Sequence, residues 1–406
     1  MNTDGKGPDR GGSTRYLARV TPEFEQGPIR PPSEAQSLLV RVVRNCPWNK
    51  CAFCPVYKRR KPSSRPTEDV LADIDGMAAA ADEIRRSAGG VGRGDDALAG
   101  FRRARRDGAV PGEAAQVALF RAAGGRSAFL QDADPCAVPA AKLAEIVRRV
   151  RERFPGLERV TTYARASTLA KRSAEDLRMV AEAGLSRVHV GLETGSDEVL
   201  ARVKKGTTAA QQIDAGRKAL GAGFELCFYV MPGLGGRDGS GEHVRGTAEV
   251  IRAVAGAAPA ERPLVVRLRT TAVAPGVPLW EEHEAGRFEL PDDVETAREI
   301  RALLEAVRDS RLLLVSDHSL NLLPELEGEL PGDAERLVGV VDEFLALPED
   351  ERAAFALGRR IGAYWTLADR GDPGRRAVVE RAAESLGART TQEILAAAAE
   401  LRSRYV

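Results

Sequence analysis

The sequence predicts an α/β fold in which parallel strands and helices alternate as a partial (β/α)6 barrel, followed by a mostly helical C-terminal domain. Short apolar runs, of the kind that a parallel sheet buries on both faces, alternate with segments of helical periodicity between residues 38 and 271. Beyond about residue 288 the helical pattern continues almost alone. A chain of 406 residues can bury the large core that such a fold requires.

The elements can be assigned in chain order. Six apolar runs are expected to be strands, at 38–43, 127–130, 159–163, 187–192, 225–231 and 264–271. Helical periodicity lies between them, at 67–84, 139–154, 173–184, 209–220 and 243–257. Because a helix joins each strand to the next, the strands should pair in parallel through right-handed crossovers. Six such units make an open, TIM-like barrel rather than the closed barrel of eight.

Composition divides the chain into three parts. Residues 1–36 are rich in Gly, Pro and charge and are expected to form a flexible lead-in. Residues 37–290 contain the barrel, with a helical insertion at about 77–125. Residues 291–406 form the C-terminal domain, with one strand-like run at 311–316. Its helices are expected at 292–309, 333–346, 360–370 and 374–401.

Charge and cysteine usage limit the class of protein. The net charge is +1, so no overall field favours nucleic acid or an anionic membrane as a partner. No apolar run has the length of a membrane span, and residues 1–6 lack the apolar core of a signal peptide. Five cysteines, three of them crowded, indicate reduced thiols that bind metal rather than a disulfide framework. We therefore expect a cytoplasmic protein.

Three of the five cysteines, Cys46, Cys51 and Cys54, fall within nine residues after the first expected strand. Three thiolates on one loop can hold three irons of a 4Fe–4S cluster. The fourth iron is then open to a ligand, because the next cysteine, Cys136, is more than eighty residues away. Two alternatives remain open. A zinc site would need a fourth Cys or His nearby, and structural thiols can cluster by chance.

This loop, with Phe53 before its third cysteine, resembles that of the radical S-adenosylmethionine (radical SAM) superfamily. The spacing C-x4-C-x2-C has one residue more than the commonest pattern, C-x3-C-x2-C. The stretch at 190–208, around Glu193, is similar to the branch that contains methylthiotransferases, Elongator-subunit-like enzymes and oxygen-independent coproporphyrinogen oxidases. Altogether the resemblance extends over about residues 38–289.

The resemblance implies two cofactors, a 4Fe–4S cluster held by the three cysteines and S-adenosylmethionine held at the strand ends. Glu193 would contact the nucleoside or methionine part of the ligand, and Lys205 its carboxylate. Arg165 could hold the same carboxylate or a substrate anion, although a surface ion pair is an equal alternative. The expected contacts of S-adenosylmethionine are Phe53, Gln131, Asp132, Asp134, Arg165, Glu193, Lys205 and Arg269.

The reasons for assigning these residues to S-adenosylmethionine differ from one residue to the next. Gln131, Asp132 and Asp134 stand where the family has oxygen atoms that receive the ligand's ammonium group, but a simple Asp-Pro turn explains Asp134 as well. Arg267 and Arg269 lie two residues apart, so both can point into the barrel. No catalytic residue is assigned.

The resemblance implies an enzyme that reductively cleaves S-adenosylmethionine, makes a 5′-deoxyadenosyl radical and removes hydrogen from an unidentified substrate. A low-potential donor, flavodoxin or ferredoxin, would supply the electron. The substrate is expected to be a small molecule, with no membrane partner and no clear nucleic-acid signature. Two alternatives remain, a haem-binding chaperone with His283 or His318 as axial ligand, and an RNA-modifying enzyme. Cys136 is expected to be buried as a small apolar residue.

Overall fold

The computed structural model of the chain describes residues 23–90 and 94–403. Its main sheet has the strand order β1-β4-β5-β6-β7-β8-β9-β10. All neighbouring strands are parallel except β9 and β10. The strands are β1 (Leu38–Arg41), β4 (Ser127–Gln131), β5 (Arg159–Ala164), β6 (Arg187–Glu193), β7 (Glu225–Val230), β8 (Leu264–Leu268), β9 (Leu312–Val315) and β10 (Gly328–Leu330). A small separate sheet pairs β2 (Val43–Arg44) with β3 (Ser63–Ser64).

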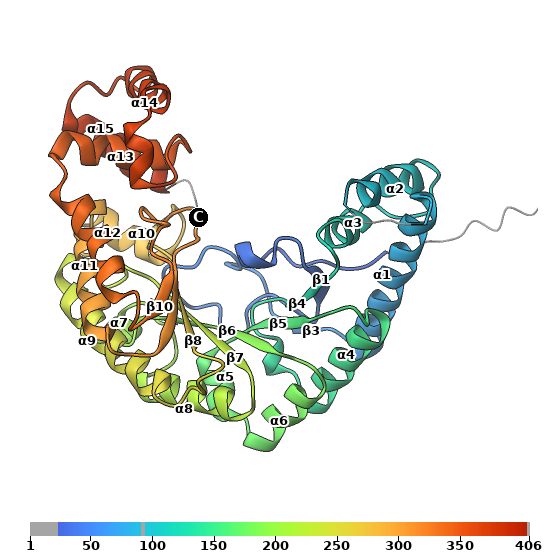
Figure 1. Cartoon of the computed structure of the whole chain (residues 1–406). Helices are drawn as coiled ribbons and strands as arrows, with labels where there is room; N and C mark the ends of the chain where they lie inside the picture. The colour runs from blue at the N-terminus through green and yellow to red at the C-terminus, as the bar shows by residue number, and fades with distance from the viewer. Residues whose placement is uncertain (1–22, 91–93, 404–406) are drawn as a thin grey trace, which may run out of the picture.

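Helices line the outer side of the curved sheet (Figure 1). The helices up to β8 are α1 (Thr67–Ser87), α2 (Asp95–Arg106), α3 (Ala114–Ala122), α4 (Ala140–Arg153), α5 (Ala166–Lys171), α6 (Ala174–Glu182), α7 (Asp197–Arg202), α8 (Ala209–Gly221) and α9 (Gly236–Ala255). Those that follow are α10 (Pro278–Glu284), α11 (Asp293–Val307), α12 (Ala334–Ala346), α13 (Glu349–Arg360), α14 (Pro373–Ser385) and α15 (Thr391–Ser403). Three short 3-10 helices are η1 (Pro32–Glu34), η2 (Pro135–Ala137) and η3 (Leu367–Gly371).

The α/β class and the parallel barrel-like sheet are confirmed. The sheet has two more strands than the six expected, β9 and β10. The strand-like run at 311–316 is β9, which pairs with β8, and β10 pairs with β9. The expected helix at 360–370 is wrong, since α13 ends at Arg360. The expected helix at 374–401 is two helices. The glycines after α13 and α14, Gly362 and Gly387, have φ of 75° and 72°, the left-handed conformation that ends helices.

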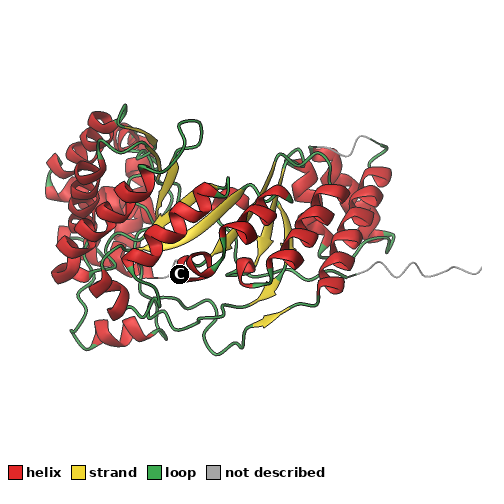
Figure 2. Cartoon of the chain, turned by 90° about the horizontal axis from the view of Figure 1, so that it is seen from below, coloured by secondary structure: helices red, strands yellow, loops and turns green. Residues whose placement is uncertain are grey.

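The helical groups lie at the two ends of the curved sheet (Figure 2). At one end, α1, α2 and α3 pack on one another, and α2 and α3 lie within residues 77–125, where a helical insertion is predicted. At the other end, α13, α14 and α15 pack together near the C-terminus. In the part of the chain that the structure describes, we find no helix long and apolar enough to cross a membrane.

The expected lead-in proves ordered where it is described, while residues 1–22 of that prediction lie outside the described residues. The N-terminal segment crosses the inside of the curved sheet (Figure 1, blue). Glu34 is fully buried there and pairs with Arg159 at 3.1 Å. Ser33 accepts a hydrogen bond of 2.9 Å from Arg267 of β8. The segment therefore fills part of the barrel interior.

Buried arginines attach the last helices to the rest of the fold. Arg402 of α15 donates to the carbonyl oxygens of Thr271 at 3.0 Å and Pro291 at 3.1 Å. Arg360 of α13 pairs with Asp293 at 2.7 Å. Because the partners of Arg402 lie at the loop after β8 and before α11, the C-terminal helices are held beside the C-terminal edge of the sheet.

Candidate functional site

The three clustered cysteines lie on the loop that follows β2, beyond the C-terminal end of β1. Two backbone hydrogen bonds fix this loop. Ala52 N–H donates to the Val203 carbonyl over 2.8 Å, and Leu279 N–H donates to the Ala52 carbonyl over 3.0 Å. A second apolar cluster beneath the loop includes Ala52, Phe53, Val203 and Leu279. All three thiols, Cys46, Cys51 and Cys54, are partly buried and free of disulfides.

Asn49 shapes the turn between the first two cysteines. Its φ of 47° lies in the left-handed region, which Asn tolerates better than most residues. Its backbone N–H lies 3.5 Å from the Cys46 sulfur, as a donor. Its side-chain amide donates to the Tyr57 carbonyl at 2.5 Å and the Arg60 carbonyl at 3.2 Å. The residue therefore ties the cysteine loop to the turn that follows it.

The donor set of this loop, three free thiols, is of the kind that binds an iron–sulfur cluster. Among the residues that the structure describes, no three His, Cys, Asp or Glu side chains surround a point that one metal ion could occupy. A cluster spreads its irons, so its thiolate ligands need not converge on one point. Burial raises the pKa of Cys51 and of Cys54, and two cations oppose that rise, Lys205 at both thiols and Arg269 at Cys54. Such positive surroundings suit thiolates that bind a metal centre.

Glu193 and Lys205 form an ion pair of 2.7 Å beside this loop. Their side chains are only 13% and 10% exposed, and the Lys205 ammonium lies 5.9 Å from the centre of the Phe53 ring. Burial disfavours the charge of Lys205, but Glu193 and Cys51 outweigh it and raise its pKa. Burial also raises the pKa of Cys51, and Lys205 opposes that rise. The structure thus brings Phe53, Glu193, Lys205 and the cysteine loop together.

The end of β6 is built around this pair. Glu193 has φ of 62°, and the pairing with β7 shifts register between Gly191 and Glu193. A Cβ on Gly191 would lie 2.3 Å from a Glu193 carboxylate oxygen and 2.8 Å from the Lys205 nitrogen. The glycine therefore leaves room that the ion pair occupies. Strained backbone of this kind occurs mostly at functional sites.

Arg165, directly after β5, reaches the same region. Its guanidinium donates to the Lys205 carbonyl at 3.0 Å and lies 5.1 Å from the centre of the Trp48 ring. The Trp48 ring also packs on Gly206, where a Cβ would meet it at 2.3 Å. Arg165 thus joins the end of β5 to the cysteine loop and to the segment that carries Lys205.

Arg269, directly after β8, completes the group at the sheet edge. Its charge acts on Cys54 and on His318. In the described part of the chain, its Nε is buried without a hydrogen-bond partner. Burial, followed by the charges of Arg269 and Arg267, lowers the pKa of His318 to about 4, so this imidazole is neutral at physiological pH.

The expected contacts after β4 have protein partners for their side chains. Gln131 bonds the backbone of Gly27 at 2.9 and 3.0 Å. Asp132 pairs with Arg41 at 2.8 Å and accepts from the Tyr57 hydroxyl. Asp134 accepts from Thr168 at 2.6 Å and from the Arg165 N–H at 3.3 Å, and burial raises its pKa to about 6. Contact between these residues and the ammonium group of S-adenosylmethionine stays a prediction.

Aromatic rings face one another inside the curved sheet. Tyr163 lies 5.0 Å from Phe129, 5.9 Å from His189 and 6.3 Å from Tyr229, between ring centres. Arg267 donates to the Tyr229 hydroxyl at 3.3 Å. These residues come from β4 to β8, below the level of Arg269. They give the interior a polar and aromatic lining.

The remaining cysteines are buried, and the two histidines weighed as haem ligands have protein hydrogen-bond partners. Cys136 is buried in the main core, where burial raises its thiol pKa. Burial raises the pKa of Cys227, on β7, to about 12. His283 bonds the Phe288 carbonyl at 2.9 Å, and His318 accepts from the Leu320 N–H at 3.2 Å.

Sequence reasoning missed Trp48, Tyr57 and Gly191 as parts of the site. Trp48 and Tyr57 belong to the cysteine loop and its continuation, and their partners lie on distant segments. The Trp48 indole donates to the Lys204 carbonyl at 2.7 Å, and Tyr57 bonds Asp132. For Gly191 the sequence contained one signal that could have indicated its role. A glycine two residues before the strand-end acid marks a place where side chains approach closely.

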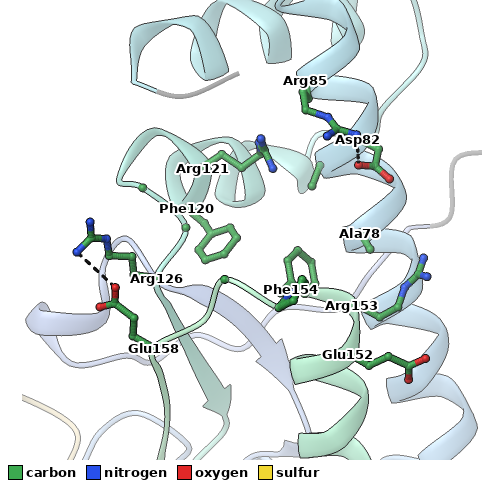
Figure 3. Close-up of a pocket in the computed structure, with 15 residues that line it drawn as sticks. Ala78, Asp82, Arg85, Phe120, Arg121, Arg126, Glu152, Arg153, Phe154 and Glu158 are labelled. Carbon is green, nitrogen blue, oxygen red and sulfur yellow. Dashed lines mark hydrogen bonds and ion pairs between the residues drawn. The ribbon is translucent and has the colours of Figure 1, made fainter. Parts of the chain in front are cut away.

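A groove of about 700 Å³ lies at the opposite edge of the sheet, before β4 and β5 (Figure 3). Phe120 and Phe154 meet edge to face in it, with ring centres 5.7 Å apart. Its charged side chains include the ion pair of Arg126 and Glu158 at 3.4 Å. None of the expected cofactor contacts lines this groove, so the groove and the thiol site are separate places.

Comparison with known proteins adds family information. The profile of the radical SAM superfamily matches residues 40–247. The chain is 27% identical over 201 residues to the tRNA-2-methylthio-N(6)-dimethylallyladenosine synthase of Delftia acidovorans, a match that covers 48% of this chain and 37% of that protein. The match therefore spans little more than a third of that relative.

Among solved structures, the radical S-adenosylmethionine methyltransferase TsrM from Kitasatospora setae, with cobalamin and a [4Fe-4S] cluster bound, is similar with a TM-score of 0.43 and 16% identity. That likeness covers 89% of this chain and 65% of TsrM. An N-terminally truncated Elp3 of the archaeon Methanocaldococcus infernus is similar with a TM-score of 0.36 and 15% identity, over 47% of this chain and 46% of Elp3.

Proposed function

This chain belongs to the radical SAM superfamily, and we propose that it makes a 5′-deoxyadenosyl radical to remove a hydrogen atom from its substrate. It is an enzyme, and its cofactors are a 4Fe–4S cluster and S-adenosylmethionine. When bound and reduced, the cluster supplies one electron to the sulfonium, whose C–S bond breaks to give methionine and the radical. We assign the cluster to Cys46, Cys51 and Cys54, in line with the sequence prediction.

The proposal assigns the binding of S-adenosylmethionine to the charged side chains at the sheet edge. Glu193 would accept hydrogen bonds from the ligand, while Lys205 and Arg165 would attract its carboxylate. Arg269 would receive either that carboxylate or an anionic group of the substrate. These residues act by orienting the ligand, because positioning is the protein's share of cofactor chemistry.

One observation carries this assignment. The buried Glu193–Lys205 pair of 2.7 Å packs on Phe53, the residue before the third cysteine. A buried ion pair is weak evidence for stability, since desolvation offsets its attraction. The strained backbone at Glu193 and the space left by Gly191 likewise favour a functional reading.

We further assign the electron to a low-potential donor, flavodoxin or ferredoxin, and the hydrogen atom to a small-molecule substrate. The five free cysteines and a cluster that must be reduced favour the cytoplasm as the place of action.

The test is reductive cleavage of S-adenosylmethionine by the anaerobically reconstituted protein. We expect about four irons per chain, the stoichiometry of one cluster, and 5′-deoxyadenosine with methionine after dithionite is added. A variant with Cys46→Ala, Cys51→Ala and Cys54→Ala should form neither product.

Methylthioadenosine in place of deoxyadenosine would mean that a different sulfonium bond breaks and would contradict the proposal. So would a fully loaded, reduced cluster that yields no product. In that case haem titration and binding of tRNA transcripts would test the two alternatives, the haem chaperone and the RNA-modifying enzyme.

A further inference from the structure

We propose that the turn of residues 58–61, here called the basic turn, together with Lys50 is the docking surface for an acidic electron-transfer protein that reduces the cluster. This inference rests on the proposed function and adds to it the place and the charge of the donor. Three observations support the inference: the positive charge of these residues, their hydrogen bonds to the cysteine loop, and the exposure of their side chains.

The charge is concentrated in one stretch. The whole chain has 60 basic and 59 acidic residues, yet residues 44–65 contain seven basic residues and no acidic one. Two of the seven are neutralised, Arg44 by Glu25 at 2.7 Å and Arg65 by Asp73 at 2.6 Å. The other five have no ion pair within the described ranges 23–90 and 94–403: Lys50, Lys58, Arg59, Arg60 and Lys61.

The basic turn is attached to the cysteine loop through its backbone. Besides the bonds from Asn49 to the Tyr57 and Arg60 carbonyls, the Asn45 amide donates to the Lys61 carbonyl at 2.6 Å. In addition, the side-chain ammonium of Lys58 donates to the Cys51 carbonyl at 2.8 Å. The turn and the three cysteines therefore form one connected unit, and a protein that docks on the turn lies against the cluster loop.

The side chains themselves point outward. Lys50, Arg59, Arg60 and Lys61 are exposed, and only Lys58 is turned toward the loop. The nearest acids along the chain, Glu68 and Asp69 at the start of α1, are exposed as well, and Asp69 faces Arg44. Exposed unpaired charges of one sign attract a partner of the other sign and speed its association.

An acidic protein fits this surface better than RNA does. Single-stranded RNA surfaces combine basic groups with aromatic rings on which bases stack. The aromatic residues of this stretch are engaged, since Phe53 and Tyr57 are buried. Trp48 packs on Gly206, with the Lys50 ammonium at 4.9 Å and the Arg165 guanidinium at 5.1 Å from its ring centre. Transient electron-transfer complexes, by contrast, use small charged contacts.

The experiment reverses the charge of the turn and follows reduction of the cluster. The variant carries Arg59→Glu, Arg60→Glu and Lys61→Glu. The matched control carries Arg102→Glu, Arg103→Glu and Arg106→Glu, an equal charge change at exposed positions of α2. The probes are flavodoxin hydroquinone, an acidic protein donor, and reduced methyl viologen, a small donor. The readout is the rate at which the visible absorbance of the reconstituted cluster bleaches.

We expect the turn variant to be reduced by flavodoxin at least about tenfold more slowly at low ionic strength, with a weaker salt dependence than the wild type. Reduction by methyl viologen should be unchanged, and the α2 control should match the wild type with both donors. Since bleaching does not require cleavage of S-adenosylmethionine, this readout is independent of the proposed reaction.

Equal rates for the turn variant and the wild type with flavodoxin would overturn the inference. An equal decrease in the flavodoxin reduction rate of the α2 control would also overturn the inference. The rate would then depend on the net charge of the protein rather than on the position of the charges. Loss of binding of tRNA transcripts, with flavodoxin reduction intact, would assign the surface to nucleic acid instead.

Discussion

Glu193 ends β6 with its carboxylate against a buried ammonium, so its charge can be tested without changing its size. In Glu193→Gln we expect affinity for S-adenosylmethionine to fall at least tenfold, because a hydrogen bond to a charged group contributes about 1.5–3 kcal/mol. Iron content should stay the same. Equilibrium binding to the reconstituted protein measures this. Glu198→Gln, an exposed change five residues further on, is the matched control. Equal affinity of both variants would assign Glu193 to structure alone.

Asp134 shows how a single carboxyl group holds an element, here the start of α5. Its pKa is raised by burial from 3.8 to about 6. Between these values the folded protein holds a proton that the unfolded chain releases, so this group makes stability fall as pH rises from about 4 to 6.

In the Asp134→Asn variant this side chain does not titrate, so the variant does not lose stability through this group as pH rises. We expect the free energy of unfolding of the variant, relative to wild type, to be about 2–3 kcal/mol more favourable at about pH 8 than at about pH 4.5. Urea unfolding of the apoprotein at the two pH values measures the difference. The exposed Asp309→Asn variant should show no such change. A relative stability that is flat with pH would mean that Asp134 is ionised throughout.

At the scale of the whole molecule, Arg402 joins the last helix to the edge of the sheet. Arg402→Ala would leave the carbonyls of Thr271 and Pro291 buried without this donor, and removal of one partner from a buried charged network costs about 3 kcal/mol or more. A Cβ on Gly233, in the loop after β7, would lie 3.8 Å from the Arg402 guanidinium. We therefore expect the Arg402→Ala variant to have lower thermal stability. Because Arg402 lies beside the loop after β7, at the sheet edge, we also expect this variant to bind S-adenosylmethionine more weakly.

Arg381→Ala on α14 is the matched control, an exposed arginine of the same C-terminal helices. Thermal unfolding and ligand binding should both match the wild type in that control. An Arg402→Ala variant as stable as the control would show that the last helix is held by its apolar contacts instead.

The predictable parts of this molecule are those whose signal is local. The apolar runs gave the parallel strands, while the assignment of Cys46, Cys51 and Cys54 to a metal cluster stays a prediction from their spacing. Glu193 was singled out by the resemblance of residues 190–208 to a radical SAM branch, and its role as a ligand contact stays a prediction. The short helix after it begins at Asp197, and the Ser196 side chain caps it.

The parts that could not be predicted depend on distant partners. Residues 23–36 have the composition of a linker, yet Gly27 is held by Gln131, 104 residues away. The partners of the Asp132 and Asp134 side chains, Arg41, Tyr57 and Thr168, also come from distant segments. Arg402 looks like any exposed helix arginine until its carbonyl partners, 131 and 111 residues away, are known.

The N-terminal segment inside the sheet has a consequence for how the chain is made. Ser33 meets Arg267, which lies 234 residues further along. At 5–20 residues per second, a ribosome needs about 10–50 seconds to synthesise the chain between them. During that time Phe24 and Glu34, both buried in the finished protein, have no completed interior to enter. Residues 24–34 therefore wait for the later strands before the inside of the barrel can form.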